Sequence, residues 1–418
     1  MAVNSGANTF TTLNSHFKET YADKIQNLIP DGGKLLKMID FIKAEKQPGN
    51  FYHQPVILSN EHGFTYGGTS GVAFALEDAI NSSSADAQVR GTEVVLKSLL
   101  SVGAASRSQN SKAAFISETK LLVENMLKSF AKRMEIQLMY GQSGLGVVES
   151  VAGLVVKVED HEWASGIWSG GEGMAVVVLD AALAVQRVST TVTAVNLDTK
   201  EITLAAVTGI VATDVIFFKS AAVAGPSFNE FAGLHKIITN TGTLFGINAS
   251  SYNLWKGNTV EVGTNFTGGE AVLQFTHIEK GIAQAMAKGL NDEEVSVICS
   301  PMSWKNLLVE QAAKRRYDQS YSSKQVQDGS NSIKFHGPNG SVEIISSIYC
   351  KEGYAYILPV KEFMRIGSSD ITFEQPGFEG KFLRLLEGYN GYEMRAYTDQ
   401  SLFTSKPGLC VLLTFLKS

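Results

Sequence analysis

Residues that could bind a metal or act as nucleophiles are few and scattered. The seven histidines form no close pair, standing at positions 16, 53, 62, 161, 235, 277 and 336. The three cysteines match no zinc-site spacing and each lies within or beside an apolar run: Cys299, Cys350 and Cys410. Such thiols are typical of buried, reduced positions. His161-Glu162 beside Trp163 suggests a metal ligand, but a loop residue next to an aromatic anchor is the better interpretation.

Glycine-rich stretches and acidic pairs are the other features that suggest chemistry. GQSGLG (141–146) and Ser169–Gly173 lack the preceding strand and following helix of a phosphate-binding loop, so both are interpreted as turns or hinges. Glu293-Glu294 is interpreted as part of a solvated loop, although an acid–base pair can also form from residues distant in sequence. No nucleophile elbow, zinc-protease motif or Walker loop occurs. The sequence therefore predicts no catalytic residue, no metal site and no cofactor.

The charge of the chain argues against a nucleic-acid-binding protein. The formal net charge is -5, and the basic cluster Lys314-Arg315-Arg316 is interpreted as a solvated helix face. Hydrophobic residues make up 44% and charged residues 18%, a low charged share that suits surfaces covered by neighbouring chains. No signal peptide is recognisable and no apolar run approaches the roughly 20 residues of a membrane span. We expect a chain made in the cytoplasm without a membrane segment.

The first part of the chain has little core of its own. Residues 1–50 predict an extended polar arm, with short helices near Phe17–Leu28 and Gly33–Phe41. Two strand-like runs, Gln54–Leu58 and Phe64–Tyr66, flank the turn-like Ser59–Gly63 and predict a hairpin. A two-stranded hairpin is marginal alone in water, so both segments need a surface to rest on, most simply another subunit.

The strongest helical pattern follows a strand-like stretch at 89–107 and runs from about 112 to 140. Apolar residues recur in steps of four and seven along one stripe: Phe115, Leu122, Met126, Phe130, Met134 and Leu138. Charged residues fall largely off this stripe: Lys120, Glu124, Lys128, Lys132 and Glu135. Ser111 can cap the helix and Gly141 ends it. About 28 residues span roughly 40 Å, the length of a strut.

Residues 147–225 have short β-type runs and no helical period. The runs are Leu154–Val158, Met174–Leu179, Val192–Leu197, Ile202–Leu204 and Val215–Phe218. Asp198-Thr199-Lys200 predicts a hairpin turn between two of them. We expect a small β-barrel or sandwich, inserted as residues 146–226. Its expected core is Val156, Val158, Trp163, Trp168, Val176, Val178, Val192, Val195, Ile202, Leu204, Ile216 and Phe218.

From Phe228 onward helices and strands alternate. Helices are predicted over Thr276–Lys288 and over Pro301–Arg316, the second with Ser300 at its N-cap. Strands are predicted over Val295–Cys299, Ser341–Ile348, Tyr354–Leu358, Phe382–Leu386, Tyr392–Tyr397 and Leu409–Leu416. This pattern favours an α+β or α/β domain with a central sheet.

The order of elements resembles the capsid fold of tailed phages typified by bacteriophage HK97. That family has an extended N-terminal arm, a projecting hairpin called the E-loop, a P-domain with a long spine helix, and an A-domain. The junction after the spine helix carries the resemblance best. There Leu138–Gly141 leads into a glycine-rich turn, and Gly233-Leu234 follows the β-rich segment. YAYILPVKEF (354–363) and the final LCVLLTFLKS are also similar to A-domain and closing strands of the family.

The resemblance implies an α+β, HK97-like capsid fold with a small all-β insertion. It also implies that the insertion enters and leaves the host domain at neighbouring points, which the turn-forming residues at its two ends support. The implied parts are 1–50 N-terminal arm, 51–80 E-loop, 81–145 P-domain with spine helix 112–140, 146–226 inserted β-rich domain, 227–375 A-domain and P/A connection, and 376–418 C-terminal strands returning to the P-domain.

The function implied by the resemblance is that of a major capsid protein without enzymatic activity. Such a chain assembles in the host cytoplasm as pentamers and hexamers, forming the icosahedral shell of the virion around double-stranded DNA that it contains without specific binding. The implied partners are other copies of the chain, reached through the arm and E-loop, together with scaffolding, portal and decoration proteins. The alternatives are an encapsulin-like nanocompartment, distinguished by protein cargo, another virion structural protein, and a β-rich hydrolase, which needs clustered carboxylates in a cleft.

Overall fold

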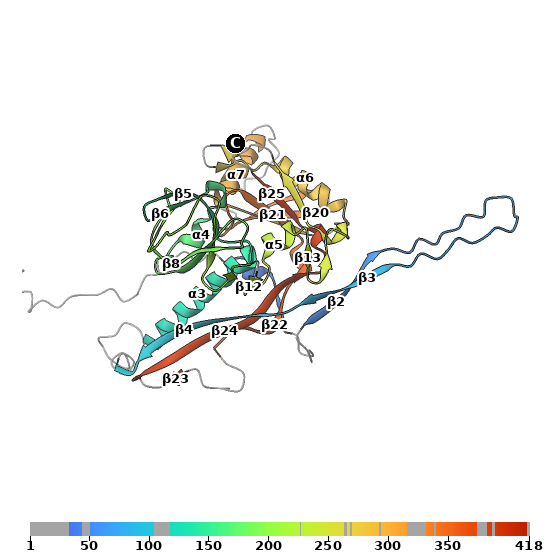
Figure 1. Ribbon diagram of the computed structural model, residues 1–418. Helices are drawn as coiled ribbons and strands as arrows, with labels where there is room; N and C mark the ends of the chain where they lie inside the picture. The colour runs from blue at the N-terminus through green and yellow to red at the C-terminus, as the bar shows by residue number, and fades with distance from the viewer. Residues whose placement is uncertain are drawn as a thin grey trace, which may run out of the picture.

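The computed structural model describes residues 33–43, 51–103, 118–225, 227–262, 266–267, 270–291, 294–315, 332–337, 340–373, 383–386 and 389–415. They form a peripheral sheet crossed by a long helix, a closed β-barrel, a central mixed sheet with helices, and a hairpin that projects far from the body (Figure 1). The short helix near Gly33–Phe41 is confirmed as α1, Leu35–Met38. Of the predicted arm, residues 1–32 and 44–50 lie outside the described residues.

The peripheral sheet has the strand order β1-β22-β24-β23, with β4 also paired to β24. Its strands are β1 (Phe41–Lys43), β4 (Thr92–Ser101), β22 (Phe363–Thr372), β23 (Leu383–Leu385) and β24 (Gly391–Thr404). Strand β4 and the first part of β24 form one long antiparallel ladder, in which Thr92 pairs with Gln400 and Ser101 with Gly391. The sequence pattern missed β1 and β22, which have no clear alternation of apolar residues.

The long helix α3, Glu118–Tyr140, lies along this sheet and ends before Gly141 as predicted. The predicted apolar stripe is confirmed, because Met126, Phe130 and Met134 are at most 4% exposed. Phe115 and the capping Ser111 lie outside the described residues.

Glu135 was expected on the outer side of this helix, and that expectation is wrong. Its side chain is fully buried and accepts three backbone N–H groups, from Lys34, Leu35 and Leu36, at 2.8–2.9 Å. These donors belong to the first turn of α1, where backbone N–H groups have no partner within the helix. The carboxylate therefore fixes the root of the N-terminal arm to the long helix, a role that no pattern within the helix itself reveals.

The β-rich segment forms a closed six-stranded barrel with the order β10-β5-β6-β9-β8-β7. The strands are β5 (Gly146–Ala152), β6 (Val155–Val158), β7 (Ala175–Leu179), β8 (Gln186–Asn196), β9 (Glu201–Leu204) and β10 (Val215–Phe218). The turn expected at Asp198–Lys200 joins β8 to β9. All expected core residues are buried except Val195, which is partly buried. Two features were missed: strand β5, and the short helices η2 (Asp160–Glu162) and α4 (Ser165–Trp168).

The two ends of the barrel segment meet, as the sequence predicted. The backbone N–H of Gly233 donates to the carbonyl of Gly141 over 2.9 Å. A Cβ at Gly141 would collide with the carbonyl oxygen of Phe231, so glycine is required for this close approach. The buried core is nevertheless continuous, because one apolar cluster includes Phe130 of α3, Val156 of the barrel and Tyr356 of the central sheet.

The central sheet has the order β15-β25-β21-β18-β20-β19 and mixes parallel with antiparallel pairs. Its strands are β15 (Asn258–Glu261), β18 (Val295–Cys299), β19 (Ser332–Gly337), β20 (Gly340–Ser346), β21 (Tyr354–Leu358) and β25 (Val411–Thr414). The associated helices are α5 (Leu234–Thr239), α6 (Phe275–Met286) and α7 (Pro301–Arg315). Short pairs and turns complete the fold: β11 (Ala222–Val223) with β12 (Ser227–Phe228), β13 (Thr243–Leu244) with β14 (Ile247–Asn248), β16 (Phe266–Thr267) with β17 (Glu270–Ala271), and η3 (Asn253–Trp255), η5 (Val360–Glu362) and η6 (Pro407–Leu409).

The two closing strands separate, which corrects the expectation that both return to the peripheral sheet. Strand β24 does lie in the peripheral sheet, but β25 pairs with β21 and β15 in the central sheet. Val411, Leu412 and Leu413 are all at most 1% exposed. A strand that is apolar on both faces belongs in the middle of a covered sheet, which explains this placement.

The projecting hairpin is longer than predicted. Strand β2 (Tyr52–Ser59) pairs with β3 (Ser83–Val89), and not with Phe64–Tyr66. Ser59–Gly63 is therefore not the reversal of the chain; residues 60–82 all lie beyond the paired strands. The turn-forming residues 59–63 do not determine the strand pairing. The pairing of β2 with β3 is determined at the base of the hairpin, because Ala87 and Val89 are buried against the body.

Candidate assembly surfaces and the buried junction

The base of the hairpin is held firmly by the body of the molecule. Leu58 and Val89 join an apolar cluster with Trp255 and Phe403. The backbone N–H of Gln88 donates to the carbonyl of Phe245 over 2.8 Å, which adds a hydrogen bond to this contact. The hairpin therefore leaves the body in a defined direction, seen in Figure 1 as the long blue extension.

Beyond this base the hairpin carries large apolar side chains into solvent. Seven are 54–91% exposed: Ile57, Phe64, Tyr66, Val72, Phe74, Leu76 and Ile80. The two limbs contact each other, since His62 N–H donates to the Ile80 carbonyl over 3.0 Å and Glu77 N–H to the Thr65 hydroxyl over 2.9 Å. An exposed apolar group of this size on a soluble protein marks an interaction site.

The outer face of the peripheral sheet carries two exposed apolar side chains. Val95 and Leu99 of β4 are 52% and 58% exposed. The neighbouring side chains Val94 and Leu96 pack inward against the core, as the two-residue alternation of a strand requires. One face of this sheet thus meets the long helix, while the other carries the two apolar side chains beside the ion pairs of Glu393.

A buried polar junction joins the long helix, the barrel and the central sheet. The Lys351 ammonium lies 2.6 Å from the Glu162 carboxylate, and both side chains are less than 10% exposed. Lys351 also donates from Nζ to the Gly144 carbonyl over 3.1 Å and from its backbone N–H to the Tyr140 hydroxyl over 2.7 Å. Tyr354 donates its hydroxyl proton to the other oxygen of Glu162. Each charge therefore has several partners, the condition under which a buried ion pair is tolerated.

The electrostatics of this junction keep Glu162 ionised and His235 neutral. Burial alone would raise the pKa of Glu162, but the Lys351 ammonium and the Tyr354 hydroxyl lower it to about 2. Burial and the nearby Lys351 charge lower the pKa of His235 to about 4. The neutral His235 ring packs edge-on against Tyr354 and its Nδ1 lies 2.9 Å from the Tyr356 hydroxyl. The polar groups of this junction are paired with one another, which indicates a structural role.

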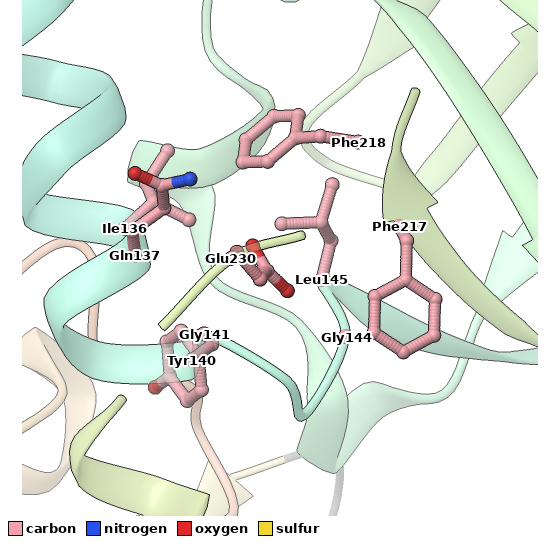
Figure 2. Close-up of a pocket in the computed structure, with 9 residues that line it drawn as sticks. All are labelled: Ile136, Gln137, Tyr140, Gly141, Gly144, Leu145, Phe217, Phe218 and Glu230. Carbon is pink, nitrogen blue, oxygen red and sulfur yellow. The ribbon is translucent and has the colours of Figure 1, made fainter. Parts of the chain in front are cut away.

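A second carboxylate, Glu230, lies where the chain passes from α3 into the barrel, in a small pocket shown in Figure 2. Glu230 accepts the backbone N–H of Gln142 over 2.8 Å, and the Gln142 side chain donates to the Glu230 carbonyl over 2.8 Å. Burial raises the pKa of Glu230 to about 7, an effect that the Gln142 hydrogen bond and the Arg133 charge only partly offset. The Arg133 guanidinium lies over the Phe218 ring of the barrel, 3.3 Å from its centroid.

The residues that the sequence singled out for chemistry take structural positions. Glu162 is the partner of Lys351, and His161 Nε2 lies 3.2 Å from Glu159. The glycine-rich stretches are turns: Gly144, Gly170 and Gly173 all have positive φ, within the 141–146 and 169–173 segments. Glu294 pairs with Lys361 over 2.9 Å, while Glu293 and Arg316 lie outside the described residues. The three cysteines are buried and unpaired with each other.

Sequence reasoning missed Lys351, Tyr354, His235 and Glu230. They meet partners 88 to 192 residues away, so no local spacing connects them. The one available signal was the position of Lys351 directly after the apolar Ile348–Cys350. That position alone does not show that the lysine is buried.

Among the described residues, no group of three or more His, Cys, Asp or Glu side chains is placed to hold a metal ion. Within the same residues, no helix is long and apolar enough to cross a membrane.

No protein-family model matches this chain, and no curated protein matches it. Among solved structures, the capsid asymmetric unit of cyanophage A-1(L) matches with a TM-score of 0.57 at 10% identity, covering 98% of this chain and 100% of that chain. The chain has the fold of a phage capsid subunit. The capsid of an empty GTA particle matches with a TM-score of 0.50 at 8% identity, covering 98% and 99% of the two chains.

The match extends over nearly the whole of both chains. The predicted fold class, a mixed α+β capsid fold, is confirmed at that level. The division of the chain into arm, E-loop, P-domain, insertion and A-domain remains a prediction.

Proposed function

We propose that this chain is the major capsid protein of a tailed phage, which assembles as pentamers and hexamers into an icosahedral shell around double-stranded DNA. The observation that carries the proposal is the projecting hairpin on a phage capsid fold. Its apolar side chains, such as Tyr66 at 91% exposed and Leu76 at 81%, find no cover among the described residues of their own chain. Burying such side chains against a neighbouring copy contributes roughly 1.5–3 kcal/mol each.

The rigid base of the hairpin supports the same proposal. An interface is strengthened when its elements are already ordered, because less conformational entropy is lost on binding. The cluster around Trp255 and Phe403 holds the base, and the Gln88–Phe245 hydrogen bond fixes its direction. The hairpin is thus built to reach another subunit in one orientation.

Val95 and Leu99 on the outer face of the peripheral sheet are proposed as a second contact between subunits. They stand on a ladder that pairs ten residues of β4 with β24. Strands that expose apolar side chains in this way readily pack against another chain. Together the two surfaces allow one subunit to contact several neighbours.

The buried junction suits a shell protein that must keep its shape under load. It links the long helix, the barrel and the central sheet through charges that have no solvent access. Its polar groups are satisfied by protein partners, so we assign it a structural role and propose no catalytic residue, metal or cofactor. DNA is contained without a dedicated binding site, in keeping with the net charge of -5. A scaffolding protein, a portal and a decoration protein are the further partners we propose.

The test is assembly of purified chain, followed by sedimentation velocity and negative-stain electron microscopy. We expect closed particles from the natural chain, and only small oligomers from the double variant Phe64→Ser, Leu76→Ser. Val309→Ser, at an exposed apolar site on α7, is the matched control and should assemble normally. A natural chain that remains a compact monomer under all assembly conditions would contradict the proposal. Particles from infected or expressing cells that enclose protein cargo and no DNA would favour an encapsulin-like nanocompartment instead.

A further inference from the structure

The chain enters and leaves the barrel through two connections that run side by side. They meet where the backbone N–H of Gly233 donates to the carbonyl of Gly141. Beside this contact the backbone is left-handed, since φ is 64° at Gln142 and 83° at Gly144. A few residues of this kind can form a hinge, about which a domain swings as a unit. Whether the barrel can swing therefore depends on the contacts that it makes elsewhere.

Those contacts are made by two loops that lie far apart in the sequence. One is the barrel segment 159–168, which contains η2 and α4; the other is the loop 347–353 between β20 and β21 of the central sheet. We call these two loops together the clamp. Three backbone hydrogen bonds join them in antiparallel order: Gly353 N–H to the His161 carbonyl over 2.8 Å, Glu352 N–H to the Trp163 carbonyl over 3.0 Å, and Gly166 N–H to the Ile348 carbonyl over 2.9 Å.

The clamp has a glycine on each side where the two loops approach most closely. A Cβ atom at Gly166 of the barrel would lie 2.9 Å from the carbonyl oxygen of Ile348. A Cβ atom at Gly353 of the other loop would lie 2.6 Å from the Cβ of His161. Neither glycine has a positive φ, so the opposite loop and not the backbone conformation excludes a larger residue. The two loops therefore fit together only in this close arrangement.

Charged side chains hold the clamp closed. The buried pair of Lys351 and Glu162 belongs to it, with one partner on each loop. At its edge Lys200 of the barrel lies 2.7 Å from Glu352 and 3.6 Å from Asp160. Opening the clamp would break the buried pair together with the three backbone hydrogen bonds, so the closed form is strongly favoured.

We propose that the clamp holds the barrel and the central sheet as one rigid unit, so that the connections at Gly141 and Gly233 do not act as a hinge. The end of α3 belongs to the same unit, because the Tyr140 hydroxyl accepts the backbone N–H of Lys351 over 2.7 Å. A change in the shape of the subunit then leaves the barrel fixed on the central sheet. This inference does not depend on assembly into a shell.

The test measures the distance between the barrel and the central sheet in the full-length chain. Leu197→Cys on the exposed β8–β9 turn and Lys280→Cys on α6 place two thiols on the surface, while the three natural thiols are buried. Both new thiols carry nitroxide labels, and pulsed electron paramagnetic resonance records the distance between them. An excess of unlabelled natural chain removes distances between copies. We expect one narrow distance distribution; a broad or two-peaked distribution would show a swinging barrel and overturn the inference.

A variant that separates the loops shows whether the clamp is the cause. Gly353→Val should broaden the distance distribution, because its side chain collides with His161, while the circular dichroism spectrum stays unchanged. Gly166→Ala creates the collision from the barrel side with a smaller side chain and replaces Gly353→Val if that variant does not fold. Gly242→Val is the matched control, since a Cβ there meets no atom within 4 Å, and it should keep the narrow distribution. A narrow distribution in a folded clamp variant would show that other contacts hold the barrel, which contradicts the proposal.

Discussion

At the residue scale, Lys351 and Glu162 stabilise the fold only as a pair. Removing one partner leaves the other charge buried in a site from which water is excluded. We predict that Lys351→Met lowers the free energy of unfolding by about 3–5 kcal/mol. The matched control is Lys334→Met, whose pair with Glu343 is solvent-exposed and should contribute at most about 1 kcal/mol.

Urea denaturation of the full-length chain, followed by fluorescence, measures both changes. The double variant Lys351→Met, Glu162→Leu should recover much of the loss, because it removes the second buried charge as well. Equal midpoints for Lys351→Met and Lys334→Met would show that the junction does not hold the fold together.

Glu230 makes stability depend on pH near neutrality. Its pKa is raised to about 7 in the folded chain from an ordinary value of 4.5, so the folded state keeps a proton that the unfolded chain has released. Stability therefore falls as pH rises from 4.5 towards 7, by up to about 3 kcal/mol, and is level above that window. Glu230→Gln should abolish this decline.

The measurement is the unfolding free energy of the natural chain minus that of Glu230→Gln, followed across this pH range. The subtraction removes the contribution of His235, whose pKa lowered to about 4 makes stability rise with pH between 4 and 6.5. A difference that does not change with pH would show that folding does not raise the pKa of Glu230.

At the element scale, the long helix α3 is the strut of the subunit. Met126 is 4% exposed on its buried stripe, while Lys128 is exposed. We predict that Met126→Asp gives insoluble protein, because the aspartate would be buried without a partner. Lys128→Asp should leave solubility nearly unchanged. The soluble fraction after lysis measures both, and equal fractions would contradict the burial of the stripe.

The barrel provides the second prediction at this scale. Residues 145–227 expressed alone should give a dispersed β-type amide NMR spectrum, because the barrel is closed and has a filled interior. Its apolar interior is continuous with the core beside α3, so we expect modest stability for the isolated segment. A collapsed, random-coil spectrum would mean that these strands fold only together with the helix.

At the scale of the whole molecule, we expect particles held together without covalent bonds between subunits. Cys299, Cys350 and Cys410 are fully buried, and burial raises the pKa of Cys299 to about 12. Thiols in that state form little thiolate and do not exchange with disulfides at neutral pH. Particles boiled without reductant should run on a denaturing gel at the mass of a single chain. A ladder of multimers would contradict this expectation and would indicate covalent crosslinks.

The sequence alone determined those elements whose pattern is local. The stripe through Met126 and Phe130 predicted the long helix, and alternating apolar runs predicted most barrel strands, because burial of one face imposes a period on neighbouring residues. Val295–Cys299 and Tyr354–Leu358 were predicted with the bounds that the structure has. The closeness of Gly141 and Gly233 was also predicted, but from the resemblance to the capsid family, with the turn-forming residues at both ends of the β-rich segment as support.

Only the tertiary structure decided which distant residues meet. The partner of β2 is Ser83–Val89, and the nearer Phe64–Tyr66 stays unpaired with it, because contacts at the hairpin base outweigh a local turn signal. Glu135 and Lys351 are charged residues that a helical or strand pattern assigns to solvent. They are buried because their partners arrive from about 100 and 189 residues away. Charge is tolerated inside a protein only where such partners converge, and convergence is a property of the folded chain.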